Sequence, residues 1–173
     1  MTIAPPFPIF AAKPIGKAGS ADKIVFMKSK LIADEQVKTY ALVFESGDEV
    51  AANLKAFAKE NQLSAASFKA IGAFERATLG WFNLEAKEYE KIQFDEQMEV
   101  LSLVGDVATD DEGEPQIHAH CVVGKRDGTA HGGHLLEAFV RPTLEVFLTE
   151  SPAHLKKTFR REFGIALIDL GKP

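Results

Sequence analysis

The chain has 173 residues, of which 46% are hydrophobic and 26% charged, values that are ordinary for one globular domain with a sizeable core. Its net charge of −5 disfavours a protein whose main task is to hold nucleic-acid phosphates, although a local basic patch stays compatible with it. The single cysteine excludes an internal disulfide framework and favours a reducing, cytoplasmic setting, and no apolar run approaches the roughly 20 residues that a membrane span needs.

The N-terminal part of the sequence predicts an arm outside the folded domain. The prolines at positions 5, 6, 8 and 14 interrupt any apolar core of a signal peptide, so residues 1–33 are expected to form an extended or disordered arm. Apolar residues such as Phe7 and Phe10 could pack on a neighbouring subunit. Residues 34–173 are expected to form one α+β domain.

Two helices are predicted within that domain. Val50, Leu54 and Phe57 recur at helical spacing, which predicts an amphipathic helix up to about residue 61. The Ser-Pro pair at 151–152 has the residue types of an N-cap and a first helical position. Residues 153–163 are therefore expected to form a short C-terminal helix.

The remaining regular segments alternate polar and apolar residues or are rich in β-branched and aromatic side chains, which is typical of strands. Strands are expected over residues 38–45, 64–70, 76–84, 89–94, 97–108 (with a possible bulge at Gly105), 143–149 and 167–170. The predicted fold class is α+β: a mainly antiparallel β-sheet with one long helix packed on it plus a short C-terminal helix.

Four of the five histidines fall in one stretch, QIHAHCVVGKRDGTAHGGHLLEAFV, which covers residues 116–140 and predicts a β-hairpin. Side chains of a strand alternate between its faces, so His118 and His120 share one face. On the return strand His131 and His134 lie three positions apart and point to opposite faces. At most one of these two can therefore join the first pair.

The length of the turn decides which histidine joins. A two-residue Asp-Gly turn would place His134 opposite the cysteine, on the wrong face. A three-residue loop, with Gly128 in the left-handed region, places His134 directly opposite His120, with Cβ atoms roughly 5 Å apart. A bulge at Gly132-Gly133 could produce an equivalent shift. These three glycines are therefore structural residues of the predicted site.

Three converging imidazoles predict a divalent-metal site formed by His118, His120 and His134. Neutral imidazoles suit Zn²⁺, with iron, nickel and copper as alternatives. Three protein ligands leave one position for water or an unknown small molecule, which is the pattern of a catalytic rather than a closed structural site. The alternative is that these histidines face solvent or form hydrogen bonds on the strand, and bind no metal.

The same stretch, together with the preceding Gly-Glu-Pro, resembles the signature of the PPC ("plants and prokaryotes conserved") domain family. The residues that fit its pattern are Gly113, His118, His120, Gly128, Gly132, Gly133, His134 and Leu135. The segment ESGDEVAANLKAFAKENQLSAASFKAIGAFERATLGWF also resembles the family's opening strand, helix and strand pair, so the resemblance covers about residues 38–170. It implies an α+β domain assembled as a homotrimer, in which the three matching histidines can bind a metal, often zinc.

Three functions stay open at this point. Plant members of the family pair the domain with an AT-hook and bind DNA. This chain has no Arg-Gly-Arg-Pro element and resembles the stand-alone prokaryotic type, so the resemblance implies a metal-binding protein with a DNA-binding or regulatory role. The alternatives are a zinc-dependent hydrolase or hydratase that uses metal-activated water, and an assembly or ligand-binding module whose histidines bind no metal.

Glu145 is the candidate catalytic residue. It lies in the middle of an apolar predicted strand, where a carboxylate is unfavourable unless it has a partner or a role. It could act as a base beside the metal or orient a ligating histidine. The alternative is an ion pair at a sheet edge or at an interface, for instance with Arg141. Cys121 is expected to be a buried core thiol, His131 a loop residue and His154 a surface residue of the C-terminal helix.

The one basic concentration of the sequence lies on that predicted C-terminal helix. Lys156, Lys157, Arg160 and Arg161 are candidates for phosphate contacts. The alternative is a solvated helix face without a ligand.

Overall fold

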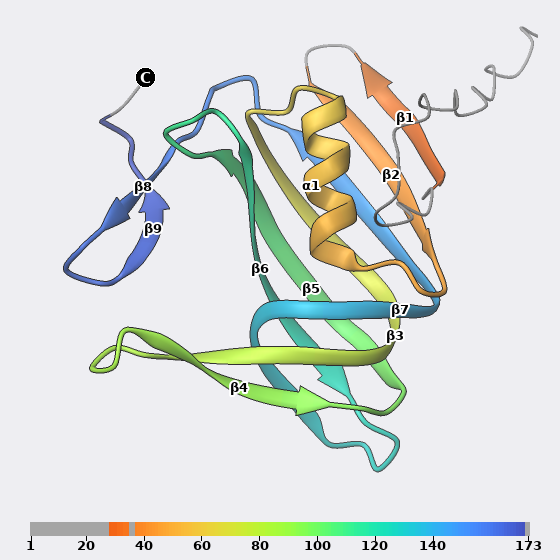
Figure 1. Cartoon of the computed structure of the whole chain (residues 1–173). Helices are drawn as coiled ribbons and strands as arrows, with labels where there is room; N and C mark the ends of the chain where they lie inside the picture. The colour runs from red at the N-terminus through yellow and green to blue at the C-terminus, as the bar shows by residue number, and fades with distance from the viewer. Residues whose placement is uncertain (1–27, 35–36, 172–173) are drawn as a thin grey trace, which may run out of the picture.

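The computed structural model describes residues 28–34 and 37–171, which form nine β-strands and one α-helix (Figure 1). In chain order the elements are β1 (Lys28–Asp34), β2 (Lys38–Glu45), α1 (Val50–Glu60), β3 (Ala65–Asn83), β4 (Glu88–Phe94), β5 (Met98–Thr109), β6 (Pro115–Gly124), β7 (Ala130–Glu150), β8 (Lys157–Arg160) and β9 (Ile165–Ile168). Most of the predicted N-terminal arm lies outside the described residues, and its last residues belong to β1, which pairs with β2. Within the described ranges, no helix is long and apolar enough to cross a membrane.

Seven of the strands form one antiparallel sheet in the order β1-β2-β7-β6-β5-β3-β4. Strand β7 also pairs with β3, so β3, β5, β6 and β7 are hydrogen-bonded in a closed ring. In Figure 1 the second half of β3 and the first half of β7 run across the direction of β5 and β6. This bend lets β7 pair with β6 in its first part and with β2 in its second part. The strands β8 and β9 form a separate hairpin.

The helix α1 covers one face of the sheet and lies in front of it in Figure 1. The side chain of Glu49 caps the helix by accepting a hydrogen bond from a backbone N–H of the first turn. Val50 and Leu54 are fully buried, and the ring of Phe57 packs edge-on against Tyr40 with 5.1 Å between centroids. The predicted helix is thus confirmed in place, but with 11 residues it is a short helix rather than a long one.

The two strands predicted over 64–70 and 76–84 are one continuous strand, β3. The chain keeps its hydrogen bonds to β7 on both sides of Gly72, where the register shifts. The two strands approach closely at this point, since a Cβ added to Gly72 would lie 2.3 Å from the carbonyl oxygen of Thr143. Glycine therefore marks a bend within a strand here, and not the end of one.

The strand predicted over 143–149 is likewise the second half of β7, which runs on through Pro142. In β5 the irregularity lies between Val100 and Ser102 and not at Gly105. Gly105 serves close packing instead, because an added Cβ would lie 2.4 Å from the carbonyl oxygen of His118.

The predicted C-terminal helix over 153–163 is wrong. This segment contributes β8, and Gly164, with φ +77°, ends the turn that leads to β9. A helix would have placed pairs of basic side chains four positions apart, where like charges repel. Contacts distant in the sequence favour the extended form, since the carbonyl of Leu155 accepts a hydrogen bond from the backbone N–H of Thr109 at 2.9 Å.

Candidate metal centre

The predicted hairpin is formed by β6 and β7, and its register is the one that a three-histidine site requires. His120 on β6 pairs directly with His134 on β7. In the turn, the N–H of Lys125 donates to the carbonyl of Thr129 and the N–H of Gly128 donates to the carbonyl of Lys125, both at 2.9 Å. Gly128 has φ +83°, in the left-handed region. This is the three-residue loop expected from the sequence, and the prediction of the register is confirmed.

The two glycines before His134 allow the strands to approach closely. A Cβ added to Gly133 would lie 2.9 Å from the carbonyl oxygen of Gly80, and one added to Gly132 would lie 3.3 Å from the carbonyl oxygen of Cys121. The pairing of β6 with β7 is regular at both positions, so no bulge contributes to the register. Gly133 thus lets β7 fit between its two neighbours, β6 and β3.

The side chains of His118, His120 and His134 gather on the sheet face opposite the core. The ring centroids are 5.2 Å apart in all three pairs, and one nitrogen from each ring lies within 4.8 Å of the other two. His120 is exposed, and the other two are half-buried. Two nitrogens bound to one zinc ion at roughly 2.1 Å are at most about 4.2 Å apart. Small ring rotations would therefore bring the three donors onto one ion.

A carboxylate lies directly behind the first of these histidines. One oxygen of Asp106 on β5 lies 3.3 Å from Nδ1 of His118, its partner in the strand register. The other oxygen lies 2.6 Å from Nζ of Lys157, a β8 residue that is 5% exposed. Burial raises the pKa of Asp106, but the hydrogen bonds from His118 and Lys157 outweigh burial and hold this pKa below its ordinary value. Asp106 is therefore a charged acceptor for both partners at neutral pH.

His134 is the most enclosed of the three histidines. The ring of Tyr89 on β4 stacks on its imidazole, with 4.6 Å between centroids and 25° between planes. Gly80 makes room for this contact, because an added Cβ would lie 2.7 Å from the Tyr89 ring. Burial, followed by the charges of the neighbouring histidines and of Lys157, lowers the pKa of His134 to about 4. The ring is therefore neutral at pH 7, which is the form that binds a metal.

These residues fit a divalent transition metal. Within the described residues, this is the one group of three or more His, Cys, Asp or Glu side chains whose donor atoms converge closely enough to hold an ion. Burial, followed by the charge of His118, also lowers the pKa of His120. The Nδ1 atom of His134 is buried and has no hydrogen-bond partner in the described part of the chain. A buried polar atom of this kind is one that a bound ion or water would satisfy.

The remaining donors nearby lie away from the cluster. Cys121 is 2% exposed on the core side of β6, and burial raises the pKa of its thiol to about 12, so the predicted core thiol is confirmed. His131 is an exposed strand residue of β7 rather than a loop residue, and its ring lies 5.2 Å from that of Phe94. His154 is exposed, as expected, but lies in the segment between β7 and β8 and not on a helix.

Glu145, the candidate catalytic residue, is exposed on the second half of β7. Strands β3 and β5 lie between this part of β7 and β6, so within one chain Glu145 is separated from the histidines of β6. Arg141, the ion-pair partner considered for it, lies 3.5 Å from Glu75 instead. A catalytic role for Glu145 stays a prediction.

The four basic residues expected on one helix face are dispersed over the region of the β8–β9 hairpin. Lys157 is buried against the carboxylate described above, and a guanidinium nitrogen of Arg160 lies 3.2 Å from Asp169. Lys156 is half-buried and Arg161 is exposed. The four residues do not form a single basic surface. Phosphate contact stays a prediction, and Lys156 and Arg161 are the better candidates for it.

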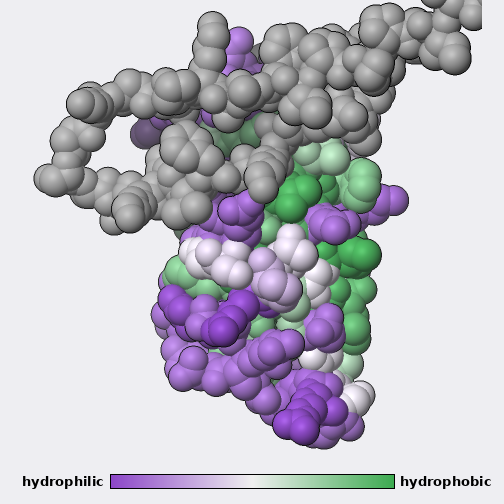
Figure 2. Space-filling model, turned by 90° about the vertical axis from the view of Figure 1, so that its right-hand side faces the viewer, coloured by the Kyte–Doolittle hydropathy of each residue, from purple (hydrophilic) through white to green (hydrophobic). Residues whose placement is uncertain are grey.

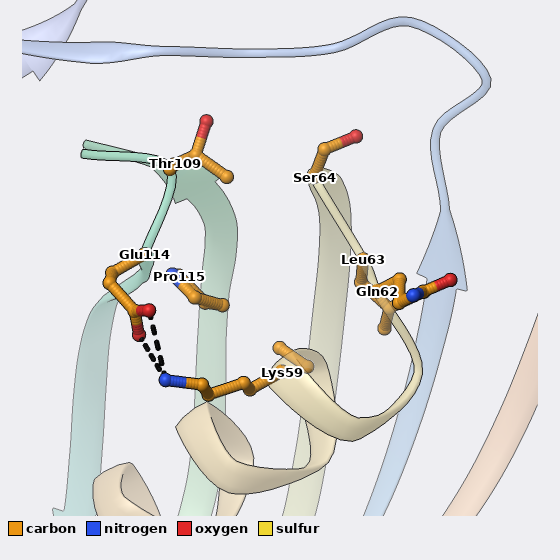
Figure 3. Close-up of a pocket in the computed structure, with 9 residues that line it drawn as sticks. Lys59, Gln62, Leu63, Ser64, Thr109, Glu114 and Pro115 are labelled. Carbon is orange, nitrogen blue, oxygen red and sulfur yellow. Dashed lines mark hydrogen bonds and ion pairs between the residues drawn. The ribbon is translucent and has the colours of Figure 1, made fainter. Parts of the chain in front are cut away.

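A cleft elsewhere on the molecule is lined by the C-terminal end of α1 and by the segment between β5 and β6 (Figure 3). Lys59 reaches across it and donates to both carboxylate oxygens of Glu114, at 2.9 and 2.8 Å. The hydroxyl of Thr109 donates to the carbonyl of Leu155 at 3.3 Å. The charged groups of this cleft are therefore already paired, and no histidine lines it.

Sequence reasoning found the three histidines but missed the residues that surround them. Asp106 carried a signal, since a carboxylate in the middle of an apolar strand needs a partner. Tyr89 and Gly80 carried none, because their contact with His134 depends on the fold of β3 against β7.

Comparisons with known proteins agree with this architecture. A family model described as the Plants and Prokaryotes Conserved (PCC) domain matches residues 32–152. Among solved structures, a "putative DNA binding protein" from Bacteroides thetaiotaomicron is 28% identical, with a TM-score of 0.78 over 84% of this chain and 99% of that chain. A plant- and prokaryote-conserved (PPC) protein from Pyrococcus horikoshii is 31% identical, with a TM-score of 0.72 over 87% and 100% of the two chains. A metal-containing protein from Archaeoglobus fulgidus is also 31% identical, with a TM-score of 0.70 over 84% and 99%. No curated protein matches the sequence.

Proposed function

Because this chain belongs to the Plants and Prokaryotes Conserved (PCC) domain family, we propose that it binds a divalent transition metal, with zinc as the first candidate, through His118, His120 and His134. The observation that carries the proposal is the convergence of three imidazole nitrogens within 4.8 Å on one sheet face. The similar protein from Archaeoglobus fulgidus is named as metal-containing, which supports it. A zinc ion held there would supply a Lewis acid with a position for a small molecule.

Metal analysis of the full chain, purified without a histidine tag, tests this proposal. After dialysis against zinc and then against metal-free buffer, elemental analysis should find about one equivalent of zinc per chain. His120→Ala should lose the metal and keep its circular dichroism spectrum, because His120 is exposed. His131→Ala is the matched control, since His131 is a neighbouring strand histidine outside the cluster. Wild-type protein without bound metal, or equal loss in both variants, would refute the proposal.

A homotrimer is the proposed assembly. An exposed apolar surface on the sheet face that carries the histidines supports an assembly of some kind. Its members are Val43, Ile71, Val104, Val122 and Phe147. Figure 2 shows hydrophobic residues gathered in a band along one edge of the molecule, beside a largely hydrophilic surface. A second copy that covers this apolar surface would remove it from water.

Light scattering coupled to gel filtration tests the assembly. Ile71, at 62%, is the most exposed member of the apolar surface, so Ile71→Glu should convert the trimer mass to a monomer mass. The matched control is Leu84→Glu, because Leu84 is 68% exposed but lies just beyond the end of β3, away from that surface. A wild-type protein that is monomeric at micromolar concentrations would remove this part of the proposal.

DNA contact is the third part, and the description of the relative from Bacteroides thetaiotaomicron supports it. Fluorescence anisotropy with a labelled duplex should show binding that weakens as salt increases. The charge reversals Lys156→Glu and Arg161→Glu should weaken it further, whereas Lys157 is left unchanged because it is buried. An absence of binding at about 150 mM salt would remove the DNA-binding component.

The hydrolase alternative is less well supported, because its proposed base, Glu145, lies apart from the histidines.

A further inference from the structure

We propose that Asp106 and Lys157 are positioning residues of the metal site, which hold His118 with its proton on Nδ1 and its lone pair on Nε2. This inference rests on the proposed metal-binding function. In a neutral imidazole one nitrogen donates a hydrogen bond and the other accepts. A carboxylate oxygen at 3.3 Å from Nδ1 favours the proton at that atom. Nε2 of His118 is then the nitrogen that faces away from Asp106 and is free to bind an ion.

The second oxygen of Asp106 is held by Lys157 at 2.6 Å. Lys157 is 5% exposed, and a buried ammonium group requires a partner because it has lost its hydration. With one oxygen fixed by Lys157, the carboxylate keeps the other directed at His118. The pair therefore fixes the orientation of the carboxylate as well as its charge.

The backbone places Lys157 over this carboxylate. The segment before β8 docks on the last residue of β5: the N–H of Thr109 donates to the carbonyl of Leu155 at 2.9 Å, and Thr109 forms a bridge with Lys156. Thr109 lies on the same strand as Asp106, so the docked segment brings Lys157 to the carboxylate. In Figure 1 the β8–β9 hairpin projects beside the end of the sheet where β5 ends and β6 begins. The C-terminal hairpin thus supports the orientation of a metal ligand on β6.

A purely structural ion pair would have a different consequence. In that case the Lys157–Asp106 contact would only secure the hairpin, and its removal would lower stability without changing the state of His118. A readout on His118 itself therefore separates the two roles.

Two measurements on the full, untagged chain test the inference. Long-range proton–nitrogen NMR spectra of the metal-free protein at about pH 8 report which nitrogen of His118 carries the proton. Competition with a chromophoric chelator gives the zinc affinity. The variant Asp106→Ala/Lys157→Met removes both charges together, so that no buried charge is left unpaired. Lys157→Met alone is a second variant, in which Asp106 keeps its contact with His118 and its 28% exposure to solvent. Lys156→Met is the matched control because it removes the adjacent, half-buried charge.

In the wild type and in Lys156→Met, we expect the proton on Nδ1 of His118. In the double variant the proton should move from Nδ1 to Nε2, and zinc affinity should fall roughly 10- to 100-fold. Lys157→Met should show a smaller loss in the same direction, and it replaces the double variant if that variant does not fold. An Nδ1 proton and a zinc affinity that both stay as in the wild type would overturn the inference. A wild type that binds no zinc would instead refute the metal proposal, while the NMR spectra would still decide what sets the His118 tautomer.

Discussion

His134 should make the metal-free protein less stable as the pH falls. Burial, followed by the charges of His118, His120 and Lys157, lowers its pKa in the folded chain to about 4. In the unfolded chain the same imidazole takes up a proton near about pH 6.5. Between these two values the unfolded state binds more protons, so the free energy of unfolding decreases as the pH falls from about 6.5 to about 4. Above about pH 7.5 the group is neutral in both states and contributes no pH dependence.

The magnitude follows from the two pKa values. One pKa unit corresponds to about 1.4 kcal/mol, and about pH 5 lies roughly 1.5 units below the pKa in the unfolded chain. The folded ring is still mostly neutral there, so the full difference would be about 2 kcal/mol. Because the imidazole is half-buried, solvent screening reduces the expected loss to about 1–2 kcal/mol.

Urea unfolding at about pH 7.5 and about pH 5, in the presence of a chelator and at one protein concentration, measures this loss. Other groups titrate over the same range, so the informative quantity is the loss in the wild type minus the loss in His134→Gln. That difference should be about 1–2 kcal/mol. His131→Gln, on the same strand but outside the cluster, should behave as the wild type. Equal pH-dependent losses in His134→Gln and the wild type would refute the assignment of an acid-sensitive, buried imidazole.

Three further predictions concern the residues around the site. Gly105→Ala should lower the free energy of unfolding by about 1–3 kcal/mol, because the added Cβ would lie 2.4 Å from the carbonyl oxygen of His118. Urea titrations measure this loss, and an unchanged urea midpoint would contradict the close packing at Gly105. At Gly128 an added Cβ meets no neighbouring atom, but the backbone at φ +83° is unfavourable for alanine. Gly128→Ala should therefore lower the free energy of unfolding by about 1–2 kcal/mol and weaken zinc binding. A zinc affinity equal to that of the wild type would show that the turn does not control the register. The thiol of Cys121, 2% exposed and with a pKa raised to about 12, should react with a thiol reagent at about pH 8 only after denaturation, and fast reaction of the folded protein would contradict its core position.

The candidate site was predictable from the sequence because it depends on local rules. Alternation along β6 places His118 and His120 on one face, and the turn at Gly128 sets which residue of β7 lies opposite. Both rules act within a single hairpin, so no knowledge of the remaining chain is required. The helix α1 was predictable for the same reason, since its apolar spacing and its cap at Glu49 are local.

The parts that could not be predicted depend on contacts between distant segments. The sequence predicted two strands, over 64–70 and 76–84, but the pairing with β7 joins them into one strand that runs through Gly72. The basic segment around Lys157 looked helical, but its partners Asp106 and Thr109 lie on β5. In both cases long-range hydrogen bonds or ion pairs outweigh local preference, and a single sequence does not show which distant residues will be the partners.

The three histidines are equivalent in the sequence pattern, yet their surroundings make them unequal. Asp106 holds His118, Tyr89 covers His134, and His120 remains exposed. If the cluster binds a metal as proposed, two of its ligands are restrained by the fold, and an ion or a small molecule would approach from the side of His120. That side belongs to the same sheet face as the apolar surface proposed as the contact between subunits. The proposed assembly and the proposed metal site therefore share one face of the molecule, so a substitution that breaks the assembly should also change the zinc affinity.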